Sequence, residues 1–600
     1  MRLADFVAEY VATLTPRVYG VVGAGAMYLN DAICNHPQIK FIAMHHEQAA
    51  AMAAEADSRV SGKIGVVHVT AGPGGTNAIT GIAGAWVDSI PMLVIAGQVA
   101  TTAMKRDGLR QLGTNELGMV EMVRSITKYS TTVIKSEDIL SVLETAVFRA
   151  MDGRRGPVFV EIPLDVQSAE IDPLKLIQTA LQVPDWVVSS YQIDEVVAAL
   201  NAAKRPLIFA GNGVHLAGAE IELRRLVYDY GIPVVTSWNG IDLFQSNDPL
   251  VVGRPGIMGD RAGNFAVQNA DVILAIGTRL SVPQIGHHGA LFAPHAQLIH
   301  VDIDGKETAK TGQYAADIRI VADAKEFLTR LLSSGLKGSP SRVEGDPGRI
   351  DWMNRCTLWK SDYPVMLPEY REATDGVNSY AFIEELGKHL DDDAIVVTDV
   401  GAAYISTMQS LQLRGTQRLF HSGGVSAMGY GIPAAIGACM AGGGRQVVCL
   451  VGDGGAMVNL QELQTITHHQ LPIAIFVFVN NGYMTMQYTQ ETHFRREAAS
   501  SPQSGIQCSN LVRIADAMNI PSYGIYSKRF LGVVKDAIKQ KYPTLCSVHM
   551  PANQLLQPRV QSKTVDGKFV PVPIHDMWPY LSREELAENM QTLDAHEFSA

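Results

Sequence analysis

Cysteine and charge are both scarce in this 600-residue sequence, and each shortage excludes a class of protein. The six cysteines are scattered without a Cys-x-x-Cys pair, so we expect free thiols instead of disulfides or a zinc site. No apolar run is long enough to span a membrane, and the first residues lack the apolar core of a signal peptide. A net charge of −11 argues against nucleic acid as a partner. We therefore expect a cytoplasmic protein without membrane or nucleic-acid partners.

Three widespread catalytic signatures are missing as well. The chain has no Gly-x-Ser-x-Gly nucleophile elbow, no His-Glu-x-x-His zinc motif and no Gly-x-x-x-x-Gly-Lys-Ser/Thr phosphate loop. Elbow-type hydrolases, metalloproteases of the zincin class and P-loop nucleotide hydrolases are therefore excluded. Any chemistry must come from other residues.

Short β-branched segments alternate with helical stretches along the whole chain, which predicts parallel sheets with helices on both faces. Six hundred residues exceed one hydrophobic core, and three such blocks are apparent. We predict an α/β protein with three doubly wound parallel-sheet domains at 1–170, 186–335 and 377–550. A linker at 336–376 is expected, because its first part is rich in Ser, Gly and Pro, and a proline-containing tail at 551–600 should wrap over the body.

The third block places a carboxylate and an amide after two consecutive predicted strands. Asp453 follows the apolar run 447–451, and Asn480 follows the apolar run that begins at 473. Between them, residues 456–469 repeat apolar side chains at helical spacing, which predicts a single helix. Because strands joined by a helix lie parallel, we expect Asp453 and Asn480 at the same edge of one sheet.

These side chains suit a magnesium ion that carries a diphosphate. Mg²⁺ prefers six oxygen ligands, and the Asp453 carboxylate, the Asn480 amide oxygen and the Gly482 backbone carbonyl would supply three of them. The surrounding glycines would let backbone N–H groups approach the phosphates at the start of a helix. Taken singly, Gly-Asp-Gly and Asn-Asn-Gly are common turns, and it is their order along the chain that favours a site.

The run Gly452-Asp453-Gly454-Gly455, followed by Asn480 at this spacing, resembles the signature of the thiamine-diphosphate enzymes, within their acetolactate-synthase-like branch. The resemblance covers most of the chain, including the segments 44–50, 70–77, 88–91, 97–99 and 126–128. It implies that the first block binds the pyrimidine end of the cofactor, that the second is a central domain, and that the third binds the diphosphate. It also implies that the two ends are held by different subunits, so a homodimer or homotetramer is expected.

The resemblance assigns the chemistry to three residues. Glu47 would hydrogen-bond the aminopyrimidine so that the cofactor can lose the proton at its reactive carbon. Met428 would wedge between the two cofactor rings, and Gly25 would lie beside the reacting carbon. Viewed alone, Glu47 is an ordinary helix-start glutamate and Met428 ordinary core filler. The further cofactor-binding positions that it implies are Pro73, Asn77, Gly401, Ala402, Gly424, Ser426, Gly452, Gly454, Gly455, Tyr483 and Met484, beside the metal ligands Asp453, Asn480 and Gly482.

The middle block carries glycines and acids at the ends of predicted strands, a pattern that suits a dinucleotide. By resemblance to acetolactate synthases these positions imply FAD. Other members of the family keep the same fold without a flavin, so a vestigial site is the alternative. The positions implied are Gly211, Asn212, Gly213, Met258, Gly277, Arg279, Asp302 and Asp304.

Three segments depart from true acetolactate synthases, at positions that the resemblance places around the second substrate. The chain has Thr-Asn-Glu at 114–116, Gly-Ala-Ala-Tyr at 401–404 and Met-Thr-Met-Gln-Tyr at 484–488. These differences imply an acceptor other than simple pyruvate. The tail segment 576–581 resembles that of acetolactate-synthase-like proteins of unusual-sugar and surface-polysaccharide pathways.

The expected activity is that of a carboligase, which decarboxylates a 2-keto acid such as pyruvate and transfers an acyl carbanion to a carbonyl acceptor, for example an activated keto-sugar. Three alternatives stay open. The chain could be a simple 2-keto acid decarboxylase or C–C hydrolase, an FAD-linked oxidase, or a catalytically silent binding protein that keeps only the fold. The presence of Glu47, Met428, Asp453 and Asn480 together argues against the silent protein.

Overall fold

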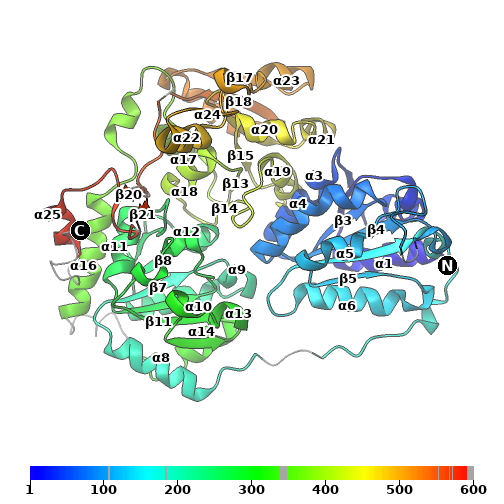
Figure 1. Ribbon diagram of the computed structural model, residues 1–600, viewed down its shortest axis with the longest axis horizontal. Helices are drawn as coiled ribbons and strands as arrows, with labels where there is room; N and C mark the ends of the chain where they lie inside the picture. Colours follow the sequence, from blue (N-terminus) through cyan, green and yellow to red (C-terminus); the bar gives the residue numbers. More distant parts are fainter. Residues whose placement is uncertain are drawn as a thin grey trace.

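The computed structural model describes residues 1–105, 108–182, 186–337, 347–551, 553–561, 563–565, 568–570 and 572–590. Within these residues, three six-stranded parallel sheets are each flanked by helices, as the sequence predicted (Figure 1). The first sheet lies at the right of the view, the second at the lower left and the third at the top. No helix in the described residues is both long and apolar enough to cross a membrane.

The first sheet has the strand order β2-β1-β3-β4-β6-β5. Its strands are β1 (Arg17–Gly20), β2 (Lys40–Ala43), β3 (Gly65–Val69), β4 (Met92–Gln98), β5 (Tyr129–Thr132) and β6 (Pro157–Pro163). Its helices are α1 (Leu3–Leu14), α2 (Met27–Cys34), α3 (Glu47–Ser61), α4 (Pro73–Asp88), α5 (Met119–Val123), α6 (Ile139–Met151) and α7 (Leu164–Gln167). Residues 176–182 then run along the lower edge of Figure 1, in the direction of the second sheet.

The second sheet has the order β12-β11-β10-β7-β8-β9. Its strands are β7 (Pro206–Ala210), β8 (Val234–Thr236), β9 (Val251–Gly253), β10 (Val272–Ile276), β11 (Gln297–Asp302) and β12 (Ile318–Val321). Its helices are α8 (Ser190–Ala202), α9 (Gly213–Ala217), α10 (Glu220–Tyr230), α11 (Arg261–Asn269), α12 (Val282–Ile285), α13 (Gly305–Thr308) and α14 (Ala324–Leu332). This order is that of dinucleotide-binding folds, with the chain changing direction between β7 and β10.

The third sheet has the order β14-β13-β15-β16-β18-β17, the same relative order as the first. Its strands are β13 (Ile395–Thr398), β14 (Arg418–Phe420), β15 (Val447–Gly452), β16 (Ile473–Val479), β17 (Ser522–Ile525) and β18 (Thr544–His549). Its helices are α17 (Ser379–His389), α18 (Ala402–Ser410), α19 (Gly431–Ala441), α20 (Asp453–Val458), α21 (Glu462–His468), α22 (Met484–Phe494), α23 (Leu511–Ala517) and α24 (Gly532–Ile538). The central strands are continuous apolar runs because helices cover both faces of the sheet.

The sequence predicted one helix between Asp453 and Asn480, and the structure contradicts this. Two helices, α20 and α21, replace it, and the break lies at Asn459. The side chain of Asn459 is buried and donates a hydrogen bond to the backbone oxygen of Gly429, 2.8 Å away. Because this bond fixes Asn459 to a distant loop, the helix ends there, and α21 begins at Glu462.

The segment predicted as a linker contains helix α16 (Pro347–Asp362). Trp352 and Trp359 of α16 are buried in the core cluster that includes α11 of the second domain. The described part of the tail has the strands β19 (Arg559–Val560), β20 (Lys563–Val565), β21 (Lys568–Val570) and β22 (Met577–Trp578) and the helix α25 (Arg583–Asn589). Ile574 and Leu586 join the same cluster, so the tail packs over the second domain.

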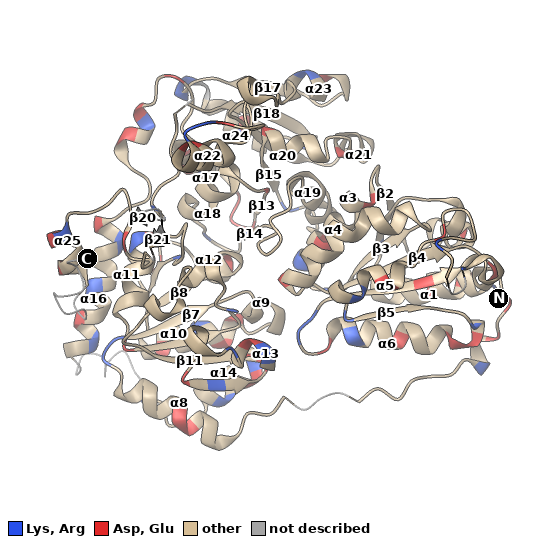
Figure 2. Cartoon of the chain, viewed as in Figure 1, with Lys and Arg blue, Asp and Glu red and all other residues tan. Residues whose placement is uncertain are grey.

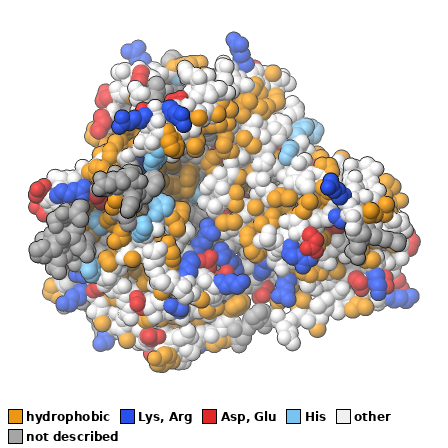
Figure 3. Space-filling model, in the orientation of Figure 1, with side chains coloured by type: hydrophobic (Ala, Val, Ile, Leu, Met, Phe, Trp, Pro, Cys, Tyr) orange, Lys and Arg blue, Asp and Glu red, His pale blue; other side chains and the backbone are white. Residues whose placement is uncertain are grey.

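The first and third domains of the chain pack together through α3 and α19. Small residues allow a close approach, and a Cβ built on Gly437 would lie 1.9 Å from the backbone oxygen of Ala53. Charged side chains lie mainly on the outer helices and loops, and the sheets are largely free of them (Figure 2). The molecular surface is hollowed where the three domains meet, with Lys and Arg side chains gathered beside the hollow (Figure 3).

Candidate active site

In the third sheet the strand order reverses between β13 and β15, and an aspartate directly follows each of these strands. Asp399 follows β13, and Asp453 follows β15 at the start of α20. Ligands of open α/β sheets bind at such a reversal, outside the carboxyl ends of the strands. Strand β16 lies beside β15, so the loop after it brings Asn480 next to Asp453. This edge of the sheet is the candidate diphosphate site.

Three oxygen-bearing groups converge at this edge. One atom of the Asn480 side-chain amide lies 2.7 Å from the Gly482 backbone oxygen and 3.3 Å from Asp453 Oδ1. With nitrogen in that position the amide donates to both oxygens; with oxygen there, three acceptors face one point. Oxygens at neighbouring corners of a magnesium octahedron lie about 3 Å apart, which these two distances bracket. The group therefore fits a hard cation in size and in chemistry.

The Asp453 carboxylate is buried and tied to the backbone. It accepts hydrogen bonds from the backbone N–H groups of Gly454, at 2.8 Å, and Asn481, at 2.9 Å. Burial nevertheless raises the pKa of Asp453 to about 6. A bound cation would favour the ionised form of this carboxylate, since an opposite charge offsets the cost of desolvation.

Glycines at the two strand ends differ in what surrounds them. A Cβ on Gly401 or Gly452 would meet no atom within 4 Å. A Cβ on Gly454 would lie 2.4 Å from the ring of Tyr483, and one on Gly455 would lie 3.1 Å from the Asp399 carboxylate. Crowding by neighbouring side chains therefore explains why glycine occupies positions 454 and 455. The open space beside Gly401 and Gly452 leaves room for a ligand against the backbone.

Residues 421–430 form the loop that carries Met428, and two aspartates hold it. Asp399 accepts from the backbone N–H groups of Gly429 and Gly431 at 3.1 Å. Asp88, from the first domain, accepts from those of Gly423 and Gly424 at 2.9 Å. The Met428 methyl lies near Gly454, 3.6 Å from the position of a Cβ there. Sequence reasoning missed both aspartates as site residues, although Asp399, like Asp453, follows a β-branched run and has a glycine within the next two residues.

The other residues predicted at the diphosphate end lie around the same edge. Ala402 begins α18, Met484 begins α22, and Tyr483 donates its N–H to the Ser500 backbone oxygen at 2.8 Å. Ser426 is exposed and has a positive φ of 54°. Gly424 and Ser426 also line the large cavity described below, so one loop carries Met428 and contributes to the cavity wall.

Glu47 lies at the start of α3 in the first domain and is 8% exposed. Asn77 donates its side-chain N–H to Glu47 Oε2 at 2.9 Å, and a Cβ on Gly74 would lie 3.5 Å from Glu47 Oε1. Pro73 begins α4 in this turn. Gly25 lies beside the same turn, since a Cβ there would be 2.7 Å from Ala71 Cβ. The structure thus brings the predicted first-domain residues together.

The Glu47 group and the Asp453 group form two separate clusters. Among the described residues, no hydrogen bond connects the two groups directly. A nearby contact between their domains is the hydrogen bond from the His45 N–H to Glu462 Oε1, at 3.1 Å. Each cluster therefore offers one half of a cofactor site.

A cavity of about 870 Å³ lies at the reversal point of the second sheet and extends to loops of the other two domains. Six of the eight positions predicted for a flavin line it: Asn212, Gly213, Met258, Gly277, Arg279 and Asp302. Gly211 lies behind this wall, where a Cβ would be 2.3 Å from the Gly277 backbone oxygen. The close packing of these two strand-end turns accounts for their glycines without a ligand. The volume of the cavity is in the range of cofactor sites.

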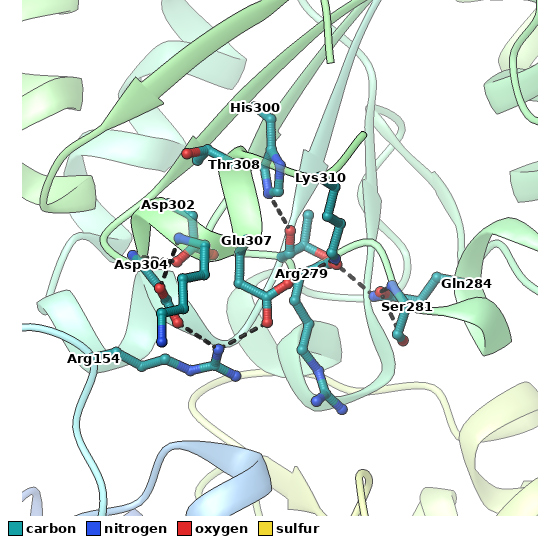
Figure 4. A network of polar contacts seen from close by, with 12 residues as sticks. Arg154, Arg279, Ser281, Gln284, His300, Asp302, Asp304, Glu307, Thr308 and Lys310 are labelled. Carbon is teal, nitrogen blue, oxygen red and sulfur yellow. Dashed lines mark hydrogen bonds and ion pairs between the residues drawn. The ribbon is translucent and has the colours of Figure 1, made fainter. Parts of the chain in front are cut away.

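Asp304, the eighth position, belongs to an ion-pair network that includes Arg154 of the cavity wall (Figure 4). Arg154 of the first domain lies 2.9 Å from Asp304 Oδ2 and 2.8 Å from Glu307 Oε1. Asp302, deeper in, accepts from the Asp304 N–H at 2.9 Å, and burial raises the pKa of Asp302 to about 6. The Arg279 side chain extends away from the network. Asp304 therefore links two domains, and Asp302 and Arg279 remain as ligand-facing groups.

Comparisons with known proteins agree with this three-part architecture. Three family models of thiamine pyrophosphate enzymes match the chain. The N-terminal TPP binding domain matches residues 1–119, the central domain residues 193–331 and the C-terminal TPP binding domain residues 399–548. An acetolactate synthase large subunit of Parasynechococcus marenigrum is 32% identical over 93% of this chain and 89% of its own. The acetolactate synthase isozyme 3 large subunit of Escherichia coli is 34% identical over 84% and 85%. The chain therefore belongs to the thiamine pyrophosphate enzymes, in their acetolactate-synthase-like branch.

Proposed function

We propose that the protein is a thiamine-diphosphate-dependent carboligase that removes carbon dioxide from a 2-keto acid and joins the remaining acyl group to a carbonyl acceptor. The observation that carries this proposal is the convergence of Asp453, Asn480 and the Gly482 carbonyl beside open glycines, in a chain similar to acetolactate synthases. When bound, the cofactor supplies a stabilised carbanion at its thiazolium carbon. The names of the relatives favour pyruvate as the donor.

The protein's own residues divide this work between the two clusters. Asp453, Asn480 and Gly482 would hold Mg²⁺, and the N–H groups near Gly401 and Gly452 would face the diphosphate. Glu47 would hold a proton against the pyrimidine ring, a role that suits a carboxyl with a single side-chain hydrogen-bond partner among the described residues. Met428, next to Gly454, would fix the bend of the cofactor.

We propose a homodimer as the smallest active unit, with a tetramer as a further possibility for the full assembly. The Glu47 and Asp453 clusters belong to different domains of one chain, and no direct hydrogen bond among the described residues connects them. A second copy would allow the first domain of one subunit to meet the third domain of the other, so that one cofactor is held at both ends.

We propose FAD as a second cofactor, in the cavity at the reversal point of the second sheet. Its support is the strand order, the volume of about 870 Å³, and the placement of Arg279 and Asp302 on its wall. Arg279 suits a diphosphate and Asp302 a ribose hydroxyl. A colourless preparation that keeps full activity would overturn this part.

The acceptor that we propose is a carbonyl compound other than pyruvate, such as an activated keto-sugar. Segment 114–116 lies against the turn below Glu47, where a Cβ on Gly72 would be 2.3 Å from the Asn115 oxygen. Tyr488, at the end of the 484–488 segment, is covered by the Arg559 guanidinium, 3.5 Å from its ring centre. Tyr404 lines the large cavity. All three departing segments thus contain or adjoin proposed thiamine-diphosphate residues, since Gly401, Ala402 and Met484 belong to two of them and Asn115 lies beside the turn below Glu47.

The test is to incubate the protein with thiamine diphosphate, Mg²⁺ and panels of 2-keto acids and carbonyl acceptors. Carbon dioxide release and coupled products are followed by mass spectrometry. Carboligation predicts coupled products in amounts that match the carbon dioxide released. Aldehyde alone would indicate a simple decarboxylase, oxygen consumption an oxidase, and no turnover with any donor a silent protein.

A further inference from the structure

A buried arginine in the described part of the tail has no partner. Arg559, at the start of β19, is 7% exposed. Among the described residues its guanidinium has no hydrogen-bond acceptor and no carboxylate within ion-pair distance, and its Nη2 atom is buried. Two other arginines are buried to a similar extent, but both donate to backbone oxygens. Arg254 donates to that of Met408 at 2.7 Å. Arg261 donates to that of Met577 at 3.3 Å.

Two aromatic rings hold the Arg559 guanidinium in place. It lies 3.5 Å from the ring centre of Tyr488 and 4.8 Å from that of Trp578. Such cation–π contacts offset only part of the cost of removing a charge from water. Burial lowers the pKa of Arg559 to about 10, so the side chain still carries its charge at neutral pH. The rings therefore position the charge without neutralising it.

Arg559 lies beside the proposed thiamine-diphosphate site. Tyr488 is four residues from Met484, so their side chains share one face of α22, with Cβ atoms about 6 Å apart. This helix directly follows the loop with the proposed metal ligands, and none of its residues, all of which the structure describes, is buried. The Val560 N–H donates to the Ile257 backbone oxygen at 2.7 Å, which fixes β19 to the second domain. The charge is therefore held one helical turn from a residue proposed to contact the cofactor.

The shape of the side chain narrows the missing partner to an oxyanion. A guanidinium is planar and carries five N–H groups around its edge, which match the paired oxygens of a carboxylate or a phosphate. With the Tyr488 ring against the guanidinium, its edge is the part left for a partner. A carboxylate or phosphate there would neutralise the charge and also satisfy the buried Nη2 atom.

The chemistry of the proposed reaction favours the acceptor as the source of this anion. A cation held against the carboxylate of the 2-keto acid would stabilise the ground state and oppose the loss of carbon dioxide. An anionic group on the acceptor keeps its charge through the whole reaction, so binding it does not oppose any step.

We propose that Arg559 binds a carboxylate or phosphate group of the carbonyl acceptor, with Tyr488 and Trp578 holding the guanidinium in position. This inference rests on the proposed carboligation and deepens it, because it names an anionic carbonyl compound as the acceptor. Arg559 is then a specificity-determining residue, separate from the groups that hold the cofactor.

Two matched pairs of acceptors test the proposal in the holoenzyme with pyruvate as the donor. Succinic semialdehyde is compared with butanal, and glyceraldehyde 3-phosphate with glyceraldehyde, so that each pair differs in one anionic group. Arg559→Met keeps the apolar stem and removes the charge and the donors. We expect it to raise the KM of an anionic acceptor by about tenfold or more and to leave that of its neutral counterpart within about twofold. The pair that responds shows whether the anion is a carboxylate or a phosphate.

Binding is measured separately, so that it does not depend on turnover. Thiamine diphosphate, Mg²⁺ and FAD are present in excess to fill the other proposed anion sites, and 4-hydroxybutyrate and glycerol 3-phosphate are titrated by calorimetry. At least one of them should bind the wild type, with an affinity that falls about tenfold or more in Arg559→Met.

Two further variants are matched controls. Arg559→Lys keeps the charge but loses the planar fork, so it should recover only part of the anion affinity. Arg583→Met removes another tail arginine, which lies 5.9 Å from the Tyr580 ring centre and pairs with Asp576 at 3.0 Å. It should change neither the anion affinity nor the KM of any acceptor.

Thermal unfolding separates a binding role from a structural one. A buried charge without a partner destabilises the fold, so Arg559→Met should unfold at the wild-type temperature or above it when no anion is present. A lower unfolding temperature with unchanged anion affinity would show a purely structural role and overturn the proposal. The proposal is also overturned if neither anion binds the wild type more tightly than Arg559→Met, or if neutral and anionic acceptors are affected equally.

Failure of the proposed carboligation would give a different pattern. If no acceptor yields coupled products but an anion binds in a manner that depends on Arg559, the reaction is refuted and the anion site is supported. Coupled products with the same KM values in wild type and Arg559→Met would refute the anion site alone.

Discussion

The first and third domains share one strand order and yet carry different polar groups. In the third, aspartates follow both strands that flank the reversal point, and each accepts several backbone N–H bonds. In the first, the equivalent strand ends β1 and β3 lead into turns of small residues, 23–26 and 70–75. Glu47, the acid proposed to contact the cofactor from the first domain, instead begins helix α3, which follows the edge strand β2.

The comparison shows that topology fixes where a ligand can bind and that a few side chains decide which part of it binds. Aspartates at the strand ends suit a cation and a diphosphate. A glutamate held by one amide, among small residues, suits proton exchange with a ring. The four predictions below test whether the two domains really divide the work in this way.

The largest effect is expected from Asp453→Ala. Losing the only charged metal ligand should lower the affinity for thiamine diphosphate in the presence of Mg²⁺ by about 100-fold or more, measured by calorimetry. Glu161→Gln, which alters a buried acid of the first domain, is the matched control and should leave that affinity within about twofold. Equal affinities in wild type and Asp453→Ala would refute the assignment of the third domain.

Glu47→Gln should affect turnover and spare binding. The amide keeps the size of the side chain but cannot exchange a proton, so we expect the turnover rate to fall by about 100-fold or more with cofactor affinity within about fivefold. Steady-state kinetics and calorimetry measure the two quantities. If the turnover rate stays near that of the wild type, the first domain does not supply the proton-handling group.

The sequence was informative where structure depends on local pattern. The apolar runs predicted as strands at 447–451 and from 473 are the strands β15 (Val447–Gly452) and β16 (Ile473–Val479), because buried parallel strands are short apolar runs between turns. The placement of Asp453 beside Asn480 also follows from local order, since it needs only two strands and one crossover.

The features that the sequence did not reveal depend on contacts between distant residues. The helix after Asp453 breaks because Asn459 bonds to the loop at Gly429. The roles of Asp88 and Asp399 become visible only when that loop is seen in place.

Asp88→Asn should weaken the link between the two domains without removing a residue that touches the cofactor. Asp88 also pairs with the buried Arg59, 2.8 Å away, and Arg59 in turn contacts Glu55. With the charge removed, the loop at Gly423 and Gly424 loses one strong acceptor, so we expect cofactor affinity to fall about tenfold.

A purely structural role of Asp88 would lower the unfolding temperature and leave cofactor affinity unchanged, so both are measured. Asp88→Glu, which restores the charge, should recover part of the affinity. An Asp88→Asn protein with normal affinity would show that the third domain holds its Met428 loop through Asp399 alone.

The smallest effect concerns stability and pH in the first domain. Burial raises the pKa of Glu161 to about 7, above its ordinary value near 4.5, although Thr132 and Gln98 hydrogen-bond it. The folded protein therefore keeps a proton that the unfolded chain releases. The contribution of this proton to the free energy of unfolding is full below about pH 4.5 and is lost as the pH rises through about 7. The free energy of unfolding falls by no more than about 1.4 kcal/mol per pH unit over this range.

Glu161→Gln should abolish this slope, because the amide stays neutral and can still hydrogen-bond Thr132 and Gln98. Unfolding temperatures at pH 5 and pH 8 should differ less in the variant than in the wild type. Glu121→Gln, at an exposed ion pair with Arg124, is the control and should leave the slope unchanged. Equal slopes in wild type and Glu161→Gln would mean that Glu161 is ionised in the folded domain, unlike the buried acids Asp302, Asp399 and Asp453 of the other two domains, whose pKa values are raised by burial.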